Sequence, residues 1–135
     1  MNSSKNHFLT QFENRLSNIL SWDQESSNSA EPTLFAAARH LCLAGGKRAR
    51  PKLTYFFSKA LDLECPEILD IAIAAEFIHN ASLLHDDVID HGTLRRGSPT
   101  ANVVWDDLTA VLAGDILLAE SIQILNNCPR IVAQE

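Results

Sequence analysis

Apolar residues recur at helical spacing along most of the chain. Over residues 8–20 they fall every third or fourth position with polar residues between them, which predicts an amphipathic helix. A second helix is expected to begin at Pro32 and to end before Gly45 and Gly46, because proline suits the first turn of a helix and glycine its C-terminal end. The polar segment 22–31 predicts a linker between these two helices.

Three more helices are expected further along the sequence. The third covers residues 51–61 and the fourth residues 66–90, and each begins at a proline. The fourth is apolar on most sides, which is typical of a central helix covered by others. A loop over 91–100 separates it from a fifth helix over 108–125. No strand is predicted, so the pattern favours an all-α fold.

The end of the sequence is unusual for a complete domain. The apolar residues 131–133 look like the start of another helix, and the sequence stops at Glu135. We therefore expect a truncated domain, and the alternative is a frayed tail.

Composition narrows the class of protein. The chain has 135 residues, 46% hydrophobic and 21% charged, which suits one globular domain or part of one. The net charge of −6 argues against nucleic acid as a partner. We identify no apolar run that spans a bilayer and no signal peptide, and therefore expect a cytoplasmic protein that is not an integral membrane protein. Three dispersed cysteines without a CxxC pair argue against a zinc ribbon or a disulfide framework.

An acidic motif, DDVID, lies at the end of the fourth predicted helix. Asp86 and Asp90 share one helix face, where like charges destabilise the helix unless a cation offsets them. Mg²⁺ takes one or two carboxylates together with substrate phosphates, which matches this pair. The alternative is a solvated helix end, although acidic residues there oppose the helix dipole. His79 lies two turns earlier on the same stripe, as a functional residue or as a hydrogen-bonded core histidine.

Two basic motifs flank the acidic one in the sequence. The segment 45–50, GGKRAR, places three cations between a helix end and a helix start, where backbone N–H groups and arginine forks suit phosphate. Arg95 and Arg96 follow the acidic motif. Each motif alone also fits a solvated loop or surface salt bridges, which contribute about 0.2–1 kcal/mol each. Together they match the needs of two diphosphates and bridging magnesium.

These motifs together resemble a known enzyme family. GGKRARP, EFIHNASLLHDDVID, TLRRGSPTAN and AGDILLAES look like successive motifs of the trans-isoprenyl (polyprenyl) diphosphate synthases, over roughly residues 34–120. The chain looks most like the octaprenyl and other long-chain members. The resemblance implies an isoprenoid synthase-type helical bundle, of which residues 1–135 would be the N-terminal part of a single domain, and a homodimer.

The resemblance implies a chain-elongating prenyltransferase that uses Mg²⁺. An allylic prenyl diphosphate would ionise, isopentenyl diphosphate would condense with it, and a proton would be eliminated. The residues implied to bind isopentenyl diphosphate are Gly46, Lys47, Arg50, His79 and Arg96.

A second group of residues is implied for the allylic substrate. Asp86, Asp87 and Asp90 would hold magnesium, and Arg95 would contact the allylic diphosphate. Of these, Asp86, Asp90 and Arg95 would be catalytic.

Product length and activity depend on two further features. Ala81 and Ser82, one turn before the acidic motif, would line the tunnel for the growing tail, and their small size favours a long product. The family also has a second aspartate-rich motif, which this sequence lacks because Asp106 and Asp107 have no matching partner. The alternative function is therefore an inactive diphosphate-binding or regulatory subunit or fragment.

Overall fold

The computed structural model describes residues 2–21 and 31–128 of the chain. Two short strands interrupt an otherwise helical sequence of elements. In chain order these are α1 (Asn2–Ile19), α2 (Glu31–Cys42), α3 (Ala49–Ala60), α4 (Glu67–Ile89), β1 (Leu94–Arg95), β2 (Ser98–Pro99), α5 (Ala101–Val104) and α6 (Asp107–Asn127).

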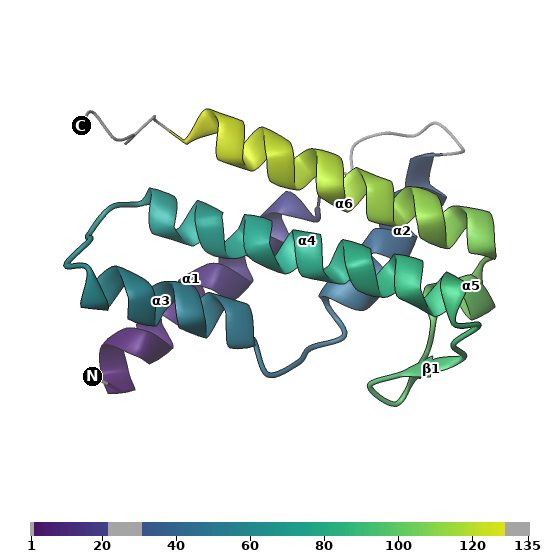
Figure 1. The fold of residues 1–135 in the computed structure, drawn as a ribbon, viewed down its shortest axis with the longest axis horizontal. Helices are drawn as coiled ribbons and strands as arrows, with labels where there is room; N and C mark the ends of the chain where they lie inside the picture. Colours follow the sequence, from purple (N-terminus) through teal and green to yellow (C-terminus); the bar gives the residue numbers. More distant parts are fainter. Residues whose placement is uncertain (1, 22–30, 129–135) are drawn as a thin grey trace.

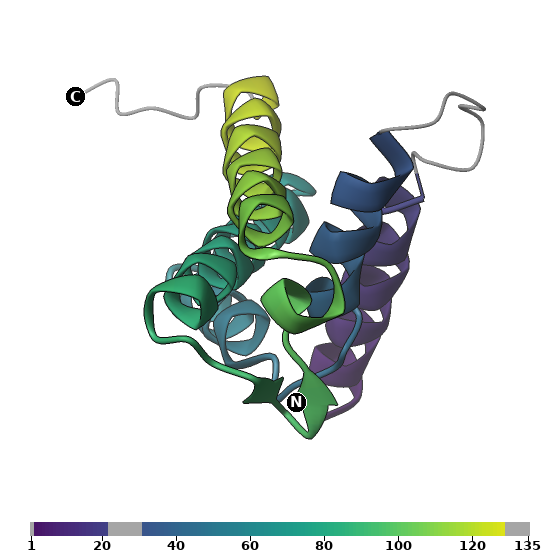
Figure 2. The ribbon, with the colours of Figure 1, turned by 90° about the vertical axis from the view of Figure 1, so that its right-hand side faces the viewer.

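Helix α4 lies at the centre of the fold. Figure 1 shows α6 running antiparallel beside it and α3 along its other side, and Figure 2 shows α1 and α2 as a second group on the side of the molecule away from α3 and α4. The core forms where these groups meet. Phe12 and Leu16 of α1, Ile73 and Phe77 of α4, and Leu117 of α6 are all fully buried there. The pairs from α1 and α4 are each four residues apart, the spacing that places two side chains on one helix face.

The five predicted helices are confirmed, with boundaries that differ by a few residues except at the start of α1. The predicted loop 91–100 instead contains a β-hairpin in which Leu94 pairs with Pro99 and Arg95 with Ser98. The prediction of no strand was wrong because two paired residues per strand leave no detectable alternation in the sequence. Residues 22–30 and 129–135, which include most of the predicted linker and the apolar segment 131–133, lie outside the described residues.

The hairpin turn holds Arg96 in a fixed place. Arg96 and Gly97 have φ values of 53° and 80°, and positive φ at both central residues is the requirement of a tight type I′ turn. At the base of the hairpin, the carbonyl of Gly92 accepts hydrogen bonds from Thr100 Oγ1 (2.8 Å) and Asn102 Nδ2 (3.0 Å). These hydrogen bonds fix the base of the hairpin, and the turn at its tip carries Arg96.

Helix α6 begins at an acidic pair. Asp106 is its N-cap, and its Oδ1 accepts a hydrogen bond from the backbone N–H of Thr109 at 2.6 Å. Asp107 lies in the first turn, where a negative charge is favoured by the helix dipole. These two aspartates thus have a local role in starting a helix.

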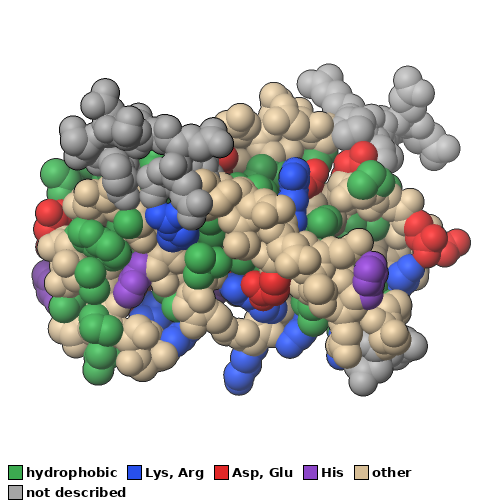
Figure 3. Space-filling view, turned by 180° about the vertical axis from the view of Figure 1, so that it is seen from behind, with side chains coloured by type: hydrophobic (Ala, Val, Ile, Leu, Met, Phe, Trp, Pro, Cys, Tyr) green, Lys and Arg blue, Asp and Glu red, His purple; other side chains and the backbone are tan. Residues whose placement is uncertain are grey.

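Two helices, α4 and α6, are long and apolar enough by length and composition to cross a membrane, contrary to the expectation from sequence. The core helix of a helical bundle has the same composition, and half of the relevant window of α4 is buried inside the fold. On the face shown in Figure 3, hydrophobic side chains gather at the end that carries α5 and the hairpin. Large exposed apolar residues lie on α3, α4 and α6, among them Phe57, Ile78 and Ile122.

Candidate functional site

A pocket of about 330 Å³ opens between the α2–α3 loop, the middle of α4 and the hairpin turn. Lys and Arg side chains lie along the corresponding edge of the molecule, the lower edge in Figure 3. The pocket brings together three segments that are far apart in the sequence. Its lining contains every residue that the resemblance assigned to isopentenyl diphosphate: Gly46, Lys47, Arg50, His79 and Arg96.

The glycine pair allows the hairpin to approach the loop. Gly45 and Gly46 have φ values of 82° and 140°, which side chains rarely tolerate. A Cβ at position 46 would lie 3.0 Å from Nη1 of Arg96, so the guanidinium covers the bare Cα of Gly46. The same Nη1 donates a hydrogen bond to the carbonyl of Gly45. The positive φ values favour glycine at both positions, and the bare Cα of Gly46 lets the Arg96 guanidinium approach the loop.

Lys47 and Arg50 present exposed cations at this pocket. The carbonyl of Lys47 accepts a hydrogen bond from Nζ of Lys52 at 2.6 Å, which links the loop to the first turn of α3. Arg50 lies in that first turn. A helix N-terminus with free N–H groups favours an anion, so backbone and side chains act in the same direction here.

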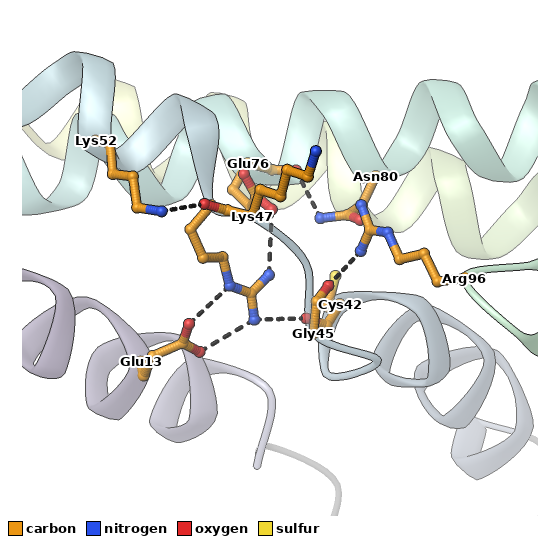
Figure 4. Close-up of polar contacts among 9 residues, drawn as sticks. Glu13, Cys42, Gly45, Lys47, Lys52, Glu76, Asn80 and Arg96 are labelled. Carbon is orange, nitrogen blue, oxygen red and sulfur yellow. Dashed lines mark hydrogen bonds and ion pairs between the residues drawn. The ribbon is translucent and has the colours of Figure 1, made fainter.

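Arg48 lies on the other side of the loop backbone and is not an exposed cation. Its Nε and Nη2 donate to the two carboxylate oxygens of Glu13 at 2.7 and 3.0 Å, and its Nη1 donates to Glu76 at 3.1 Å. Nη2 also donates to the carbonyl of Cys42 at 3.1 Å. Figure 4 shows Glu13 and Glu76 on opposite sides of this group. Of the three cations predicted to face phosphate, the loop therefore exposes two.

His79 is partly buried beside these cations. Burial lowers the pKa of its imidazole below the ordinary 6.5, and the positive charges of Arg50 and Arg96 lower it further, against the opposing effect of Glu76. The lowered pKa favours the neutral imidazole at pH 7, which can form a hydrogen bond with a ligand without adding a charge.

The three aspartates of the acidic motif face two directions. The backbone N–H of Asp90 donates to the carbonyl of Asp86 at 2.8 Å, so these two exposed residues lie one turn apart on one face, as predicted. Asp87 is buried and accepts three hydrogen bonds from Arg95, at 2.7, 2.9 and 3.1 Å. The structure thus joins Asp87 to Arg95 and leaves Asp86 and Asp90 as the exposed carboxylates.

The exposed pair fits magnesium only together with a ligand. Within residues 2–21 and 31–128, no group of three His, Cys, Asp or Glu side chains is placed to hold a metal ion. Mg²⁺ does not need such a group, because it binds through one or two carboxylates, waters and substrate phosphates. Asp86 and Asp90 are the residues that suit this mode of binding.

The two predicted tunnel residues also differ. Ala81 is fully buried in the hydrophobic core, so the structure does not place it on an open tunnel wall. Ser82 is exposed, and its hydroxyl donates to the carbonyl of His79 at 2.8 Å. Ser82 lies four residues before Asp86 and therefore on the same face. Ala81 and Ser82 are adjacent in the sequence, but Ala81 faces the core and Ser82 lies on the exposed face of α4 that carries Asp86.

The sequence interpretation missed a contact between α4 and α6. His85 Nε2 lies 3.1 Å from the carbonyl oxygen of Val111 and 3.4 Å from a carboxylate oxygen of Asp115. A Cβ on Gly114 would lie 2.3 Å from this nitrogen, so only glycine permits the contact. The AGD sequence at 113–115 was the available signal. This contact holds α4 against α6 at the residue before Asp86.

Comparison with known proteins agrees with this geometry. The family model described as polyprenyl synthetase matches residues 31–134. A short chain isoprenyl diphosphate synthase from Methanocaldococcus jannaschii is 45% identical over 95 residues, which cover 69% of this chain and 28% of that protein.

Two solved structures show the same fold. The geranyltransferase from Legionella pneumophila has a TM-score of 0.80 and 32% identity, over 93% of this chain and 44% of that one. A polyprenyl synthase from Caulobacter crescentus, complexed with calcium and isoprenyl diphosphate, has a TM-score of 0.73 and 33% identity, over 90% and 36%. The chain spans less than half the length of these proteins. The match to the family model covers most of the chain, which therefore belongs to the polyprenyl synthetase family.

Proposed function

We propose that this chain acts in prenyl transfer as the N-terminal part of a prenyl diphosphate synthase, and that its pocket binds isopentenyl diphosphate. The observation that carries the proposal is the convergence of five residues from three separate segments on one pocket. Their chemistry matches a diphosphate, because the pocket combines exposed cations, a helix N-terminus and a neutral histidine.

The pocket residues have distinct tasks in this proposal. Lys47, Arg50 and Arg96 neutralise the diphosphate from three sides, and His79 donates a hydrogen bond to it. Binding in this way orients the double bond of isopentenyl diphosphate toward the allylic substrate, and orientation of two reactants contributes much of the rate of a condensation.

The allylic substrate would bind along the exposed face of Asp86 and Asp90. These two carboxylates would hold Mg²⁺, which when bound stabilises the charge of the departing diphosphate. The C–O bond of the allylic diphosphate then breaks, the double bond of isopentenyl diphosphate attacks the allylic carbon, and a proton leaves. The calcium and isoprenyl diphosphate in the Caulobacter relative support the pairing of a hard cation with this ligand class.

Arg95 has a positioning role in the structure described here. Its guanidinium is held by Asp87 at the end of α4, and this ion pair braces the hairpin that carries Arg96. We retain contact between Arg95 and the allylic diphosphate as part of the proposal, which requires exchange of its partner on binding. Association as a homodimer and location in the cytoplasm also belong to the proposal.

A second candidate function is diphosphate binding without turnover. It is favoured by one observation: among the described residues no group of three His, Cys, Asp or Glu side chains is placed to hold a metal ion, and Asp86 and Asp90 supply carboxylates from one helix face. Both candidates share the pocket and differ only in the chemical step.

Calorimetry with isopentenyl diphosphate tests the pocket. We expect Lys47→Gln to weaken binding by about tenfold to a hundredfold, the effect of losing one hydrogen bond to a charged group. Lys59→Gln is the matched control, because Lys59 is a lysine in the last turn of α3 that pairs with Glu64 at 2.6 Å, outside the pocket. Equal losses in both variants would contradict the proposed site.

The same method with an allylic diphosphate analogue tests the metal face. We expect Mg²⁺ to strengthen binding of the analogue, and we expect Asp86→Asn to remove that gain. Asp62→Asn is the control, since Asp62 is exposed on another loop and its φ of 54° suits asparagine. Equal affinity with and without Mg²⁺ would refute the bridging role of Asp86 and Asp90.

A further inference from the structure

Arg48 occupies the junction of three elements, and the hydrogen bonds of its guanidinium go to acceptors within the protein. It lies between Lys47 and Arg50 in the sequence, yet its side chain is 8% exposed while its backbone follows the same loop. The guanidinium connects the loop to α1 through Glu13, to α4 through Glu76 and to the end of α2 through the Cys42 carbonyl.

The backbone of Arg48 also requires an explanation. Its φ of 47° and ψ of 46° place it in the left-handed region, which is unfavourable for a residue with a Cβ. This conformation turns the side chain of Arg48 inward and lets Lys47 and the first turn of α3 face the pocket. The ion pairs hold the residue in a conformation that it would otherwise leave.

Further contacts fix the guanidinium on its inner side. The guanidinium carbon lies 5.7 Å from the ring centroid of Phe12, a fully buried residue of α1. Glu76 is buried as well, and it lines the pocket one turn before His79. A displacement of Arg48 would therefore change both the loop and the pocket wall.

We propose that Arg48, clamped between Glu13 and Glu76, is a positioning residue that sets the α2–α3 loop for diphosphate, and that Glu13 of α1 acts on the pocket through it. The inference rests on the proposed function for its ligand. It adds an N-terminal helix, which does not line the pocket, to the machinery that shapes it.

The direction in which Glu13→Gln changes the affinity for isopentenyl diphosphate distinguishes a positioning role of Glu13 from a purely electrostatic one. Glu13 carries a negative charge close to a site for an anion. If Glu13 acted only through its charge, Glu13→Gln would strengthen diphosphate binding, because repulsion between like charges would be removed. If Glu13 holds Arg48 in place, the same substitution weakens binding. We expect about threefold to tenfold weaker binding of isopentenyl diphosphate by calorimetry.

Arg15→Gln supplies the matched control on the same helix. Arg15 also joins α1 to α4, through Asp70 at 3.3 Å, but this pair is exposed and lies outside the pocket. Arg15→Gln should leave the affinity for isopentenyl diphosphate unchanged. Unchanged or stronger binding in Glu13→Gln would overturn the positioning role.

A measurement without ligand keeps the two proposals distinguishable. We expect amide hydrogen exchange over residues 45–49 to accelerate in Glu13→Gln and to stay unchanged in Arg15→Gln. Arg48→Lys should accelerate it too, because one ammonium group cannot bridge three acceptors in a fork. If the wild-type chain fails to bind isopentenyl diphosphate while the loop still loosens, the function proposal fails and the clamp stands. If exchange is equal in all variants, the clamp is refuted whatever the ligand result.

Discussion

Two arginines of the binding region, Arg48 and Arg96, adopt left-handed backbone conformations in adjacent loops. Such conformations are unfavourable for residues with a Cβ and persist where the surroundings hold them. Arg48 is held by a buried ion pair with Glu76 and a partly exposed one with Glu13, whereas Arg96 is exposed at a hairpin turn and lines the pocket. The same backbone conformation thus places Arg48 where it supports the loop and Arg96 where it lines the pocket.

Two substitutions of Arg96 distinguish the effect of its guanidinium on ligand binding from the effect of its backbone conformation on stability. Arg96→Asn and Arg96→Ala both remove the guanidinium, so we expect equal losses of affinity for isopentenyl diphosphate. Asparagine tolerates the left-handed conformation better than alanine. The free energy of unfolding should therefore be about 1 kcal/mol lower for Arg96→Ala than for Arg96→Asn. Calorimetry and urea unfolding provide the two readouts. Equal stability of the variants would show that the turn is not strained at this residue.

Titration of His79 reports the charge of the pocket. NMR should give an apparent pKa below 6.5 for the free protein, because burial and the neighbouring arginines disfavour the imidazolium. Addition of inorganic diphosphate should raise this pKa, since an anion favours the charged ring. A midpoint unchanged by diphosphate would place His79 away from the ligand.

The same lowered pKa has a consequence for folding. Between the folded-state pKa and 6.5 the unfolded chain binds more protons at position 79 than the folded chain does, so the free energy of unfolding falls as the pH falls through this window. Above pH 6.5 the effect is absent. Comparison of thermal unfolding at pH 7.5 and 5 should show a smaller loss in His79→Gln than in the wild type.

At the scale of the element, α4 has two faces with different tasks. Ala81 points into the core, and Ser82 shares the exposed face with Asp86. We expect Ala81→Phe to lower the unfolding free energy by about 1–3 kcal/mol through overpacking, and Ser82→Phe to leave it nearly unchanged. Denaturant unfolding of both variants checks this. A tolerated phenylalanine at position 81 would instead place that residue on an open wall, as the sequence interpretation had it.

The helices themselves were predictable because their apolar spacing and their proline and glycine boundaries are local signals. The pocket residues were identified through motifs, and the structure brings them together as the resemblance implied. The directions of Arg48, Asp87 and Ala81 were not predictable in this way. Each depends on a partner distant in sequence or on which side of α4 is covered, and a period of 3.6 residues cannot select between adjacent positions near the edge of a face.

At the scale of the whole molecule, the described part of the chain exposes large apolar residues on α3, α4 and α6, such as Phe57, Ile78 and Ile122. Where such residues form a contiguous patch, they mark a surface that is covered by another protein segment or subunit. The exposed face of α4 carries Ile78, Ser82 and Asp86 in one line, so whatever covers this side would also close the space beside the metal-binding carboxylates.

Because Asp86 and Asp90 are exposed, we expect the isolated chain to bind ligand without catalysing the reaction. The pocket for isopentenyl diphosphate is built from described residues alone, so the purified 135-residue chain should bind that ligand. Departure of the allylic diphosphate requires charge stabilisation from a preorganised and water-excluded site, and that stabilisation is commonly the largest catalytic effect. Asp86 and Asp90 supply one exposed side only, and the sequence contains no second aspartate-rich motif to face them.

We therefore expect calorimetry to show binding of isopentenyl diphosphate. With farnesyl diphosphate as the allylic substrate and Mg²⁺ present, we expect no radiolabel from isopentenyl diphosphate in an elongated product. Asp86→Asn and the control Asp62→Asn identify any contaminating activity, because a contaminant would be equally active in both preparations. Radiolabelled product that is lost in Asp86→Asn and kept in Asp62→Asn would contradict the prediction, since it would show that one pair of carboxylates on an exposed helix face is sufficient for the ionisation step.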